Sequence, residues 1–178
     1  MGAIDSLKKL IVDDAVVSLT QEYGKNKCVL TESQSDYSFT IHSLPDDVLI
    51  VKCDKFPTTK EVFFKSENME CKISDYVLVS ESKQVIMFFE LKRSNRSSSA
   101  KEIAAQLKGG KCVMDYCESI IDSFLGEREI FCGFRRKYYK GISMPSKKRP
   151  FRRNENLDNT TPENARMLLG SAVNFSYL

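Results

Sequence analysis

The 178-residue sequence has no Trp and a single His, His42. Any acid–base mechanism that uses an imidazole group therefore depends on His42 alone. The six cysteines are scattered, and no two of them have the Cys-x-x-Cys spacing of zinc sites, which argues against a zinc site. A Gly-rich phosphate loop and a nucleophile elbow are also missing, so the sequence carries no motif of an NTPase motor or a Ser hydrolase.

Long apolar runs are missing as well, since none approaches the roughly 20 residues that a membrane-spanning helix needs. Because no signal peptide is recognisable, we expect a cytoplasmic (intracellular) protein in a reducing compartment, without membrane association. Hydrophobic residues make up 42% of the chain, which is enough for a real core. The length predicts one domain that spans residues 1–178.

The most informative stretch runs from Lys72 to Arg93 and predicts a β-hairpin. Val85–Phe89 is an unbroken apolar run, which is typical of a strand buried on both faces. Val77–Val79 is a second, shorter apolar run, and the polar segment Ser80–Gln84 is the only break between the two. An antiparallel hairpin is the simplest connection.

The register of this hairpin follows from the position of its turn. If Ser82 and Lys83 centre the turn, Asp75 falls directly opposite Glu90. Lys92 shares the face of Glu90, because strand side chains alternate. Two carboxylates that close repel each other unless a cation joins them, and a hard divalent ion such as Mg²⁺ or Mn²⁺ suits their oxygens. The alternative is a surface hairpin end at which a Glu–Lys pair is solvated.

Asp75, followed after 14 residues by Glu90-Leu91-Lys92 behind a hydrophobic strand, resembles the signature of the PD-(D/E)XK (restriction-endonuclease-like) nuclease superfamily. Ser74 stands where many members have Pro. The resemblance implies an α/β fold with an αβββαβ core, in which helices flank a mixed central sheet. It also implies Mg²⁺- or Mn²⁺-dependent hydrolysis of phosphodiester bonds, with DNA expected ahead of RNA and a role in phage defence or repair.

The resemblance assigns a role to each residue of the motif. Asp75 and Glu90 would bind the metal ion together with the backbone carbonyl group of Leu91. Lys92 would position the attacking water molecule or stabilise charge. All four residues lie at one end of the predicted hairpin.

Two further residues are expected to support this site by the same resemblance. A carboxylate on the first helix often completes the metal site, and Glu22 is the expected residue, ahead of Asp14. Gln106 lies at the start of the helix that follows the Glu-x-Lys strand, where a Gln supports the active site in several subgroups. The alternative for both is an ordinary polar residue on the solvated face of a helix.

Apolar periodicity predicts the order of the other elements. They are an amphipathic helix at Asp5–Tyr23, a polar loop at Lys25–Ser35, strands at Tyr37–Leu44, Val48–Cys53 and Glu61–Lys65, a second helix at Ala100–Leu125, a strand at Glu129–Tyr138 and a last edge strand within Ala165–Leu178. Gly109 and Gly110 lie inside the second helix, where Gly is unfavourable. Close packing on the sheet, the approach of a phosphate group, or a kink would explain them.

A basic tract covers residues 135–153, with nine Lys or Arg residues and no acid, although the net charge of the whole chain is only +3. A basic tract on an otherwise acidic chain predicts a polyanionic partner, which we expect to be nucleic acid. The residues expected to contact it are Arg93, Arg96, Lys108, Lys111, Arg135, Arg136, Lys137, Lys147, Lys148 and Arg149. For the second half of the tract, a solvated loop with no specific partner is the alternative.

Two other functional hypotheses stay open. The chain fits a catalytically silent member of the fold that binds nucleic acid or another protein. It also fits an adaptor subunit that cleaves only with a partner carrying helicase or NTPase motifs. A homodimer would account for double-strand cleavage, although no heptad pattern indicates one.

Overall fold

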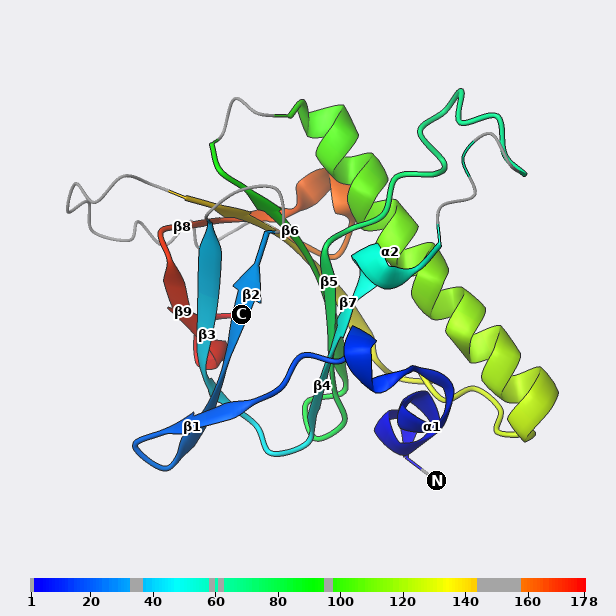
Figure 1. The fold of residues 1–178 in the computed structure, drawn as a ribbon, viewed down its shortest axis with the longest axis horizontal. Coiled ribbons are helices and arrows are strands. Elements are labelled where there is room, and N and C mark those ends of the chain that lie inside the picture. Colours follow the sequence, from blue (N-terminus) through cyan, green and yellow to red (C-terminus); the bar gives the residue numbers. More distant parts are fainter. Residues whose placement is uncertain (1, 33–36, 58–59, 61–62, 95–97, 144–157) are drawn as a thin grey trace.

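The computed structural model of the protein describes residues 2–32, 37–57, 60, 63–94, 98–143 and 158–178. These residues form a mixed α/β structure with two mixed β-sheets (Figure 1). The helices are α1 (Ala3–Leu10) and α2 (Ala100–Ile120), which continues as a π-helical turn at Ile121–Leu125, with short 3₁₀ turns at Asp13–Ala15, Cys53–Lys55, Pro162–Asn164 and Phe175–Tyr177. The strands are β1 (Thr20–Glu22), β2 (Lys25–Thr31), β3 (Ser38–Leu44), β4 (Val48–Lys52), β5 (Tyr76–Ser80), β6 (Val85–Lys92), β7 (Arg135–Ile142), β8 (Arg166–Leu169) and β9 (Ala172–Asn174).

The larger sheet has the strand order β4-β5-β6-β7-β8. Strands β4, β5 and β6 run antiparallel, whereas β6, β7 and β8 run parallel. Helix α2 connects β6 to β7 along one face of the sheet, as a parallel pair requires (Figure 1). The predicted hairpin is confirmed as β5–β6, with Ser80 opposite Val85 and Val77 opposite Phe88.

The smaller sheet has the strand order β1-β2-β3-β9. Tyr23 and Gly24 have φ angles of 49° and 71° and form the two-residue turn between β1 and β2, so that Glu22 pairs with Lys25. Strand β9 joins this sheet as the parallel partner of β3. Gly24, which directly follows the helix predicted at Asp5–Tyr23, is therefore part of a hairpin turn.

Two hydrophobic cores lie on the two faces of the larger sheet. One lies between the sheets and includes Ile41 and Phe89. The other lies between the larger sheet and the helices and includes Phe88 and Leu107. Because both faces of β6 are covered, every residue from Val85 to Leu91 is buried, which accounts for its continuous apolar run.

Gly109 and Gly110 allow α2 to lie directly on the chain that leads into β5. A Cβ atom at Gly109 would lie 1.7 Å from the carbonyl oxygen of Lys72, and one at Gly110 would lie 2.0 Å from Oγ of Ser74. Of the explanations considered for this pair, close packing is the one that the structure supports. The predicted second helix is confirmed as α2 and its π-helical turn.

The predicted helix at Asp5–Tyr23 is wrong beyond its first turns, because α1 ends at Leu10. The chain is then largely extended, and the backbone N–H of Val17 donates to the carbonyl oxygen of Ile50 at the edge of β4 (2.9 Å). The β-branched residues in this segment favour extended backbone where a strand edge is free to pair. Pairing with a distant strand thus overrides the helical periodicity.

The predicted loop at Lys25–Ser35 is also wrong, since it contains β2. Cys28 and Leu30 of this strand are buried in the core between the sheets, while their neighbours face outward. The strand predicted at Tyr37–Leu44 is confirmed as β3, and the one predicted at Val48–Cys53 is confirmed as β4. Strand β3 pairs with β2 rather than with β4, so it does not extend the meander of the larger sheet.

The strand predicted at Glu129–Tyr138 begins later, at Arg135. Glu129 and Gly133 have positive φ angles of 51° and 79°, which place the residues before β7 in turns. The predicted C-terminal edge strand corresponds to β8, and β9 joins the other sheet. Of the strand predicted at Glu61–Lys65, residues 61 and 62 lie outside the described residues.

No helix in the described part of the chain is both long and apolar enough to cross a lipid bilayer. All six cysteines are free thiols, and Cys28, Cys53 and Cys117 are buried. Burial raises the pKa of the Cys28 thiol to about 12, so this thiol behaves as a small apolar group.

Candidate active site

Asp75 and Glu90 meet at the open end of the β5–β6 hairpin. Tyr76 pairs with Phe89, so the next residues outward are Asp75 and Glu90, as the predicted register requires. Oδ2 of Asp75 accepts a hydrogen bond of 2.7 Å from the backbone N–H of Leu91. This bond holds one carboxylate oxygen of Asp75 against the strand that carries Glu90.

Glu90 lies on the face of β6 that α2 covers, and its side chain has no exposed surface. Nζ of Lys92 lies 2.6 Å from Oε1 of Glu90, and the Lys92 side chain remains 17% exposed. Apart from Lys92 and a weak contact with the backbone N–H of Asp75, neither Glu90 oxygen has a hydrogen-bond partner among the described residues. A buried carboxylate with so few partners is unfavourable unless a further cation stabilises it.

The electrostatics of the site reflect this burial. Burial raises the pKa of Glu90 to about 8, and the neighbouring Asp75 adds to the rise while Lys92 opposes it. Burial also raises the pKa of Asp75 to about 6. The hydrogen bond from the Leu91 N–H and the charge of Lys92 both lower this pKa, but burial outweighs them. For Lys92, burial lowers the pKa, but the ion pair with Glu90 outweighs burial and the net shift is upward. Burial therefore makes the ionised forms of both acids less favourable than they are in water, and Lys92 is the cation that opposes this effect.

A second lysine lies beside the pair. Lys140 of β7 is the strand partner of Glu90 in the parallel register, and it is 9% exposed. Burial and the charge of Lys92 lower the pKa of Lys140, whereas Glu90 raises it. The sequence showed Lys140 only as a member of the basic tract, because its place next to Glu90 depends on the pairing of two parallel strands that are far apart in the chain.

Two further acids, which the sequence did not single out, influence Asp75. The hydroxyl group of Tyr76 accepts from the N–H of Thr31 (3.0 Å) and donates to its carbonyl oxygen (2.6 Å), which holds the end of β2 beside the start of β5. Glu32 follows directly in the chain. The negative charges of Glu32 and Asp54 add to the rise in the pKa of Asp75.

Gln106 lies on the sheet-facing side of α2, one turn before Gly110. A Cβ atom at Gly110 would lie 3.3 Å from the ring of Phe88. Gln106 precedes Gly110 by four residues, which is about one helical turn. Oε1 of Gln106 is buried without a hydrogen-bond partner among the described residues. The supporting role predicted for Gln106 stays a prediction.

Glu22 lies in β1 of the smaller sheet, so the prediction that it belongs to a helix is wrong. It forms an ion pair with Lys27 (3.1 Å), and Nδ1 of His42 lies 3.4 Å from its carboxylate group. Glu22 pairs with Lys25 at one end of β2, whereas Asp75 adjoins the other end, roughly 20 Å away along the strand. The structure therefore does not bring Glu22 to the hairpin end.

A divalent cation would have two carboxylates as side-chain ligands here. In the part of the chain that the structure describes, no group of three or more His, Cys, Asp or Glu side chains is arranged to hold a metal ion. Mg²⁺ retains several water ligands and often needs only one or two protein carboxylates. Asp75 and the partner-poor oxygens of Glu90 therefore fit such an ion, with the Leu91 carbonyl group as a possible third oxygen ligand.

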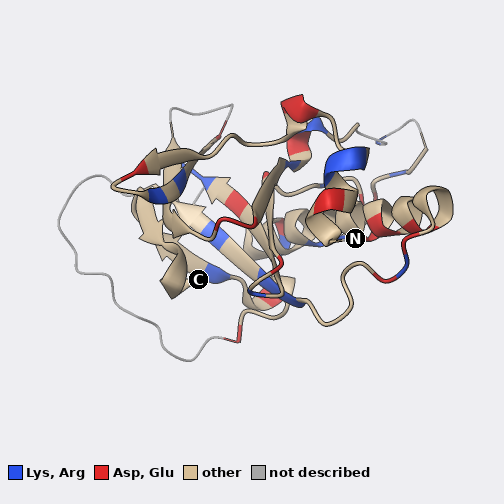
Figure 2. Cartoon of the chain, turned by 90° about the horizontal axis from the view of Figure 1, so that it is seen from below, with Lys and Arg blue, Asp and Glu red and all other residues tan. Residues whose placement is uncertain are grey.

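Several of the cations expected to contact nucleic acid have acidic partners. Lys108 pairs with Glu163 (2.5 Å), and Lys111 and Arg136 both pair with Asp115. Helix α2 accordingly carries residues of both signs (Figure 2). Three others, Arg93, Arg135 and Lys137, have no acidic partner among the described residues, and Arg96, Lys147, Lys148 and Arg149 lie outside those residues.

Comparison with known proteins identified no relative of this chain. No protein-family model matches the chain, and no curated protein or solved structure matches it either. Function is therefore inferred from the residues at the hairpin end and from their surroundings.

Proposed function

We propose that the protein is a metal-dependent nuclease of the restriction-endonuclease-like type, which hydrolyses phosphodiester bonds in DNA ahead of RNA. One observation carries the proposal. Asp75, Glu90 and Lys92 gather at the end of a buried hairpin, where the Glu90 carboxylate has no exposed surface and has Lys92 as its main partner. A solvated Glu–Lys pair, the alternative considered for this motif, would not be buried in this way.

The order of the elements supports the same family. Without the inserted strands β1, β2 and β3, the chain runs α1, β4, β5, β6, α2, β7, which is the αβββαβ order of the PD-(D/E)XK core. The Asp of the motif directly precedes β5, and Glu-x-Lys ends β6. The proposal therefore assigns both parts of the motif to the strands that carry them in that core.

The residues that would hold Mg²⁺ or Mn²⁺ are Asp75, Glu90 and the backbone carbonyl group of Leu91. When bound, such an ion lowers the pKa of a coordinated water molecule and neutralises the charge of the scissile phosphate. The hydrogen bond from the Leu91 N–H orients Asp75, so one of its oxygens is fixed before any ligand arrives. This preorganisation lowers the entropic cost of assembling the site.

Two lysines supply positive charge on the same face. Lys92 has a raised pKa and remains cationic at neutral pH, so its ammonium group can donate to a water molecule or to a phosphate oxygen. Lys140 adds a second positive charge beside Glu90. Gln106 offers a buried amide oxygen without a partner among the described residues, and in the proposal it accepts a hydrogen bond from the attacking water.

A catalytically silent member of the fold is the second candidate function. It would bind nucleic acid, or act as an adaptor with a protein partner such as a helicase or NTPase. The observation in its favour is that no group of three or more His, Cys, Asp or Glu side chains among the described residues is arranged to hold a metal ion. Homodimerisation is compatible with either function.

The decisive experiment is a cleavage assay with matched variants. Supercoiled, linear and single-stranded DNA, and RNA, are incubated with the protein in Mg²⁺ or Mn²⁺. We expect Glu90→Gln and Lys92→Met each to lower the rate by about 100-fold or more, since the first removes a metal ligand and the second removes a cation that can donate to a phosphate oxygen. Glu22→Gln and Lys8→Met are the controls, because these residues lie in β1 and on the exposed face of α1.

Three results are distinguishable. Cleavage that requires metal, Glu90 and Lys92 supports the nuclease. Glu90-dependent Mn²⁺ binding measured by calorimetry, without cleavage of any substrate, favours the silent or adaptor function. Absence of both cleavage and Glu90-dependent metal binding would overturn the proposed metal site.

A further inference from the structure

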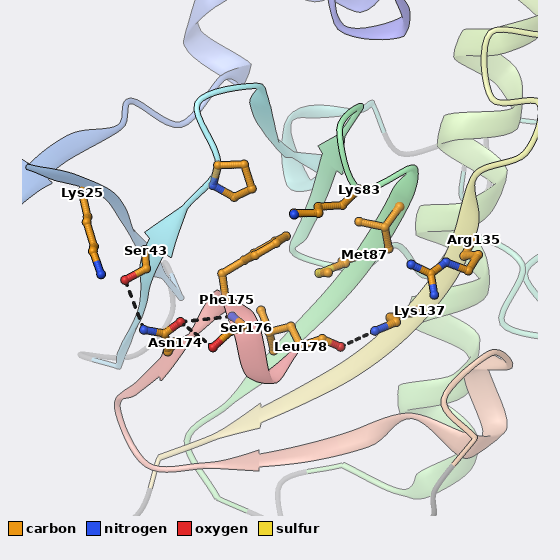
Figure 3. Close-up of a pocket in the computed structure, with 12 residues that line it drawn as sticks. Lys25, Ser43, Lys83, Met87, Arg135, Lys137, Asn174, Phe175, Ser176 and Leu178 are labelled. Carbon is orange, nitrogen blue, oxygen red and sulfur yellow. Dashed lines mark hydrogen bonds between the residues drawn. The ribbon is translucent and has the colours of Figure 1, made fainter.

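A cavity of about 600 Å³ lies at the opposite end of the hairpin from Glu90. Val85 and Met87 line it from β6, on the face that points toward the core between the sheets, and Phe175 lines it from the C-terminal segment (Figure 3). Glu90 lies roughly 17 Å further along the strand and on the face that α2 covers. The cavity is therefore separate from the candidate active site.

Four cationic side chains from three parts of the chain line this cavity. Lys25 belongs to β2, Lys83 to the turn between β5 and β6, and Arg135 and Lys137 to β7. The described residues around the cavity include no Asp or Glu. Lys137 donates to a main-chain oxygen of Leu178, the last residue of the sequence, whose negative charge offsets that of Lys137, whereas the side chains of Lys25, Lys83 and Arg135 have no partner among the described residues.

The positive charges in this region act on one another. Burial lowers the pKa of Lys137, and the nearby Arg135 and Arg166 lower it further. Cations that repel one another in a partly enclosed space create a positive potential that attracts an anion. Figure 3 shows the Lys83 ammonium group and the Arg135 guanidinium group on two sides of Met87, with Lys25 on the far side of the cavity next to Ser43.

We propose that this cavity binds a phosphate-bearing ligand of nucleotide size, with its phosphoryl oxygens held by Lys83 and Arg135 and its remaining part extending toward Lys25. A phosphate monoester carries about −1.5 to −2 charges and several acceptor oxygens, which match the two cations better than a single carboxylate does. The Asn174 amide, which donates to Oγ of Ser43 (3.1 Å), adds polar groups to the wall.

The size of the cavity points to a ligand with an organic part. A volume of about 600 Å³ exceeds what inorganic phosphate fills and lies in the range of small-molecule sites. Two sources share this chemistry: a free nucleotide and the phosphorylated end of a nucleic-acid strand. The inference goes beyond the proposed nuclease activity and does not depend on it, because Asp75, Glu90 and Lys92 do not line the cavity.

Calorimetric titration of the full chain in chelator tests the proposal. The probes are adenosine 5′-monophosphate, inorganic phosphate, and two single strands of one DNA sequence with and without a 5′-phosphate. We expect Lys83→Ala and Arg135→Ala each to weaken nucleotide binding by about tenfold, because each removes a charge-assisted hydrogen bond. Lys8→Ala and Arg128→Ala are exposed controls that remove the same charges elsewhere, and we expect them to bind as the wild type does.

The probes distinguish the two sources. Tighter binding of the 5′-phosphorylated strand than of the free nucleotide identifies a strand end, and the reverse order identifies a free nucleotide. The proposal is overturned if neither binds at about 5 mM, if inorganic phosphate binds as tightly as the nucleotide, or if the Lys83→Ala/Arg135→Ala double variant keeps its affinity. Glu90→Gln should bind the probes with wild-type affinity, so failure of the nuclease proposal leaves this result unchanged.

Discussion

Nζ of Lys92 lies 2.6 Å from Oε1 of Glu90, whose side chain has no exposed surface. The two residues are two positions apart on β6, so the strand itself brings them to one face. The burial of Glu90 comes from the elements packed around the strand, and it raises the pKa of Glu90 to about 8 despite the neighbouring lysine. The charge of this pair therefore depends on pH and on any cation that binds.

The stability of the metal-free protein should fall as the pH rises from about 4.5 toward 8, and Glu90→Gln should lose this dependence. The folded-state pKa of Glu90 lies above its ordinary value of 4.5, so the folded state keeps a proton that the unfolded state releases. Stability from this difference is fully present below the ordinary pKa and is lost as the pH passes the folded-state value. Thermal unfolding in chelator should show the wild-type Tm falling by about 5 °C more than that of the variant. The exposed Glu67→Gln variant should follow the wild type, and identical profiles for wild type and Glu90→Gln would contradict the prediction.

Metal affinity should depend on Glu32 and not on Glu22. The negative charge of Glu32 acts on Asp75, whereas Glu22 is paired with Lys27 and His42 in the other sheet. We expect Glu32→Gln to weaken Mn²⁺ binding several-fold through the loss of a nearby negative charge, and Glu22→Gln to leave it unchanged. Calorimetry on the two isosteric variants provides the comparison. Equal effects of both substitutions would show that the placement of β2 relative to Asp75 does not matter for metal binding.

Lys140 should tune the pH dependence of cleavage. Its positive charge lies beside Glu90 and favours the ionised carboxylate, so Lys140→Met should raise the pKa of Glu90 further. The rising limb of the pH–rate profile should then move to higher pH, and the rate at neutral pH should fall by about tenfold. Lys140→Arg keeps the charge and should restore most of the wild-type profile. A lower rate with an unchanged profile in Lys140→Met would point to a purely structural role.

Gly110→Ala should destabilise the fold by about 2 kcal/mol or more. The added Cβ atom would lie 2.0 Å from Oγ of Ser74 and 3.1 Å from its Cβ atom, so α2 would have to move away from the chain entering β5. Chemical denaturation measures the change in unfolding free energy. Cys112→Ala, at an exposed position two residues further along α2, is the matched control and should change stability by no more than about 0.5 kcal/mol. A neutral Gly110→Ala variant would contradict the close contact between α2 and the sheet.

The β5–β6 hairpin could be predicted because its contacts are local. A short polar turn joins two apolar runs, and the centre of the turn sets which residues pair. The opposition of Asp75 and Glu90 follows from that register alone. Helix α2 could also be predicted from the sequence. A long amphipathic repeat with an apolar stripe is compatible with few structures other than a helix.

Other parts of the fold depend on partners that no local pattern reveals. The segment after Leu10 has helical periodicity, yet Val17 pairs with Ile50 at the edge of a distant strand. The sequence of strand β2 resembles a polar loop, because one face of the strand is exposed to solvent. Its other face is buried only when the two sheets pack together. In both segments, a tertiary contact outweighs the local preference.

The sequence by itself determined that Asp75, Glu90 and Lys92 share one end of a hairpin, because register and alternation are properties of neighbouring residues in the chain. Only the tertiary structure decided what surrounds them. It buries Glu90 beneath α2, places Lys140 at its side through a parallel strand pair, and brings Glu32 rather than Glu22 toward Asp75. The physical reason is that burial and electrostatic environment arise from contacts between segments far apart in the chain, and those contacts form only when the sheets and helices pack.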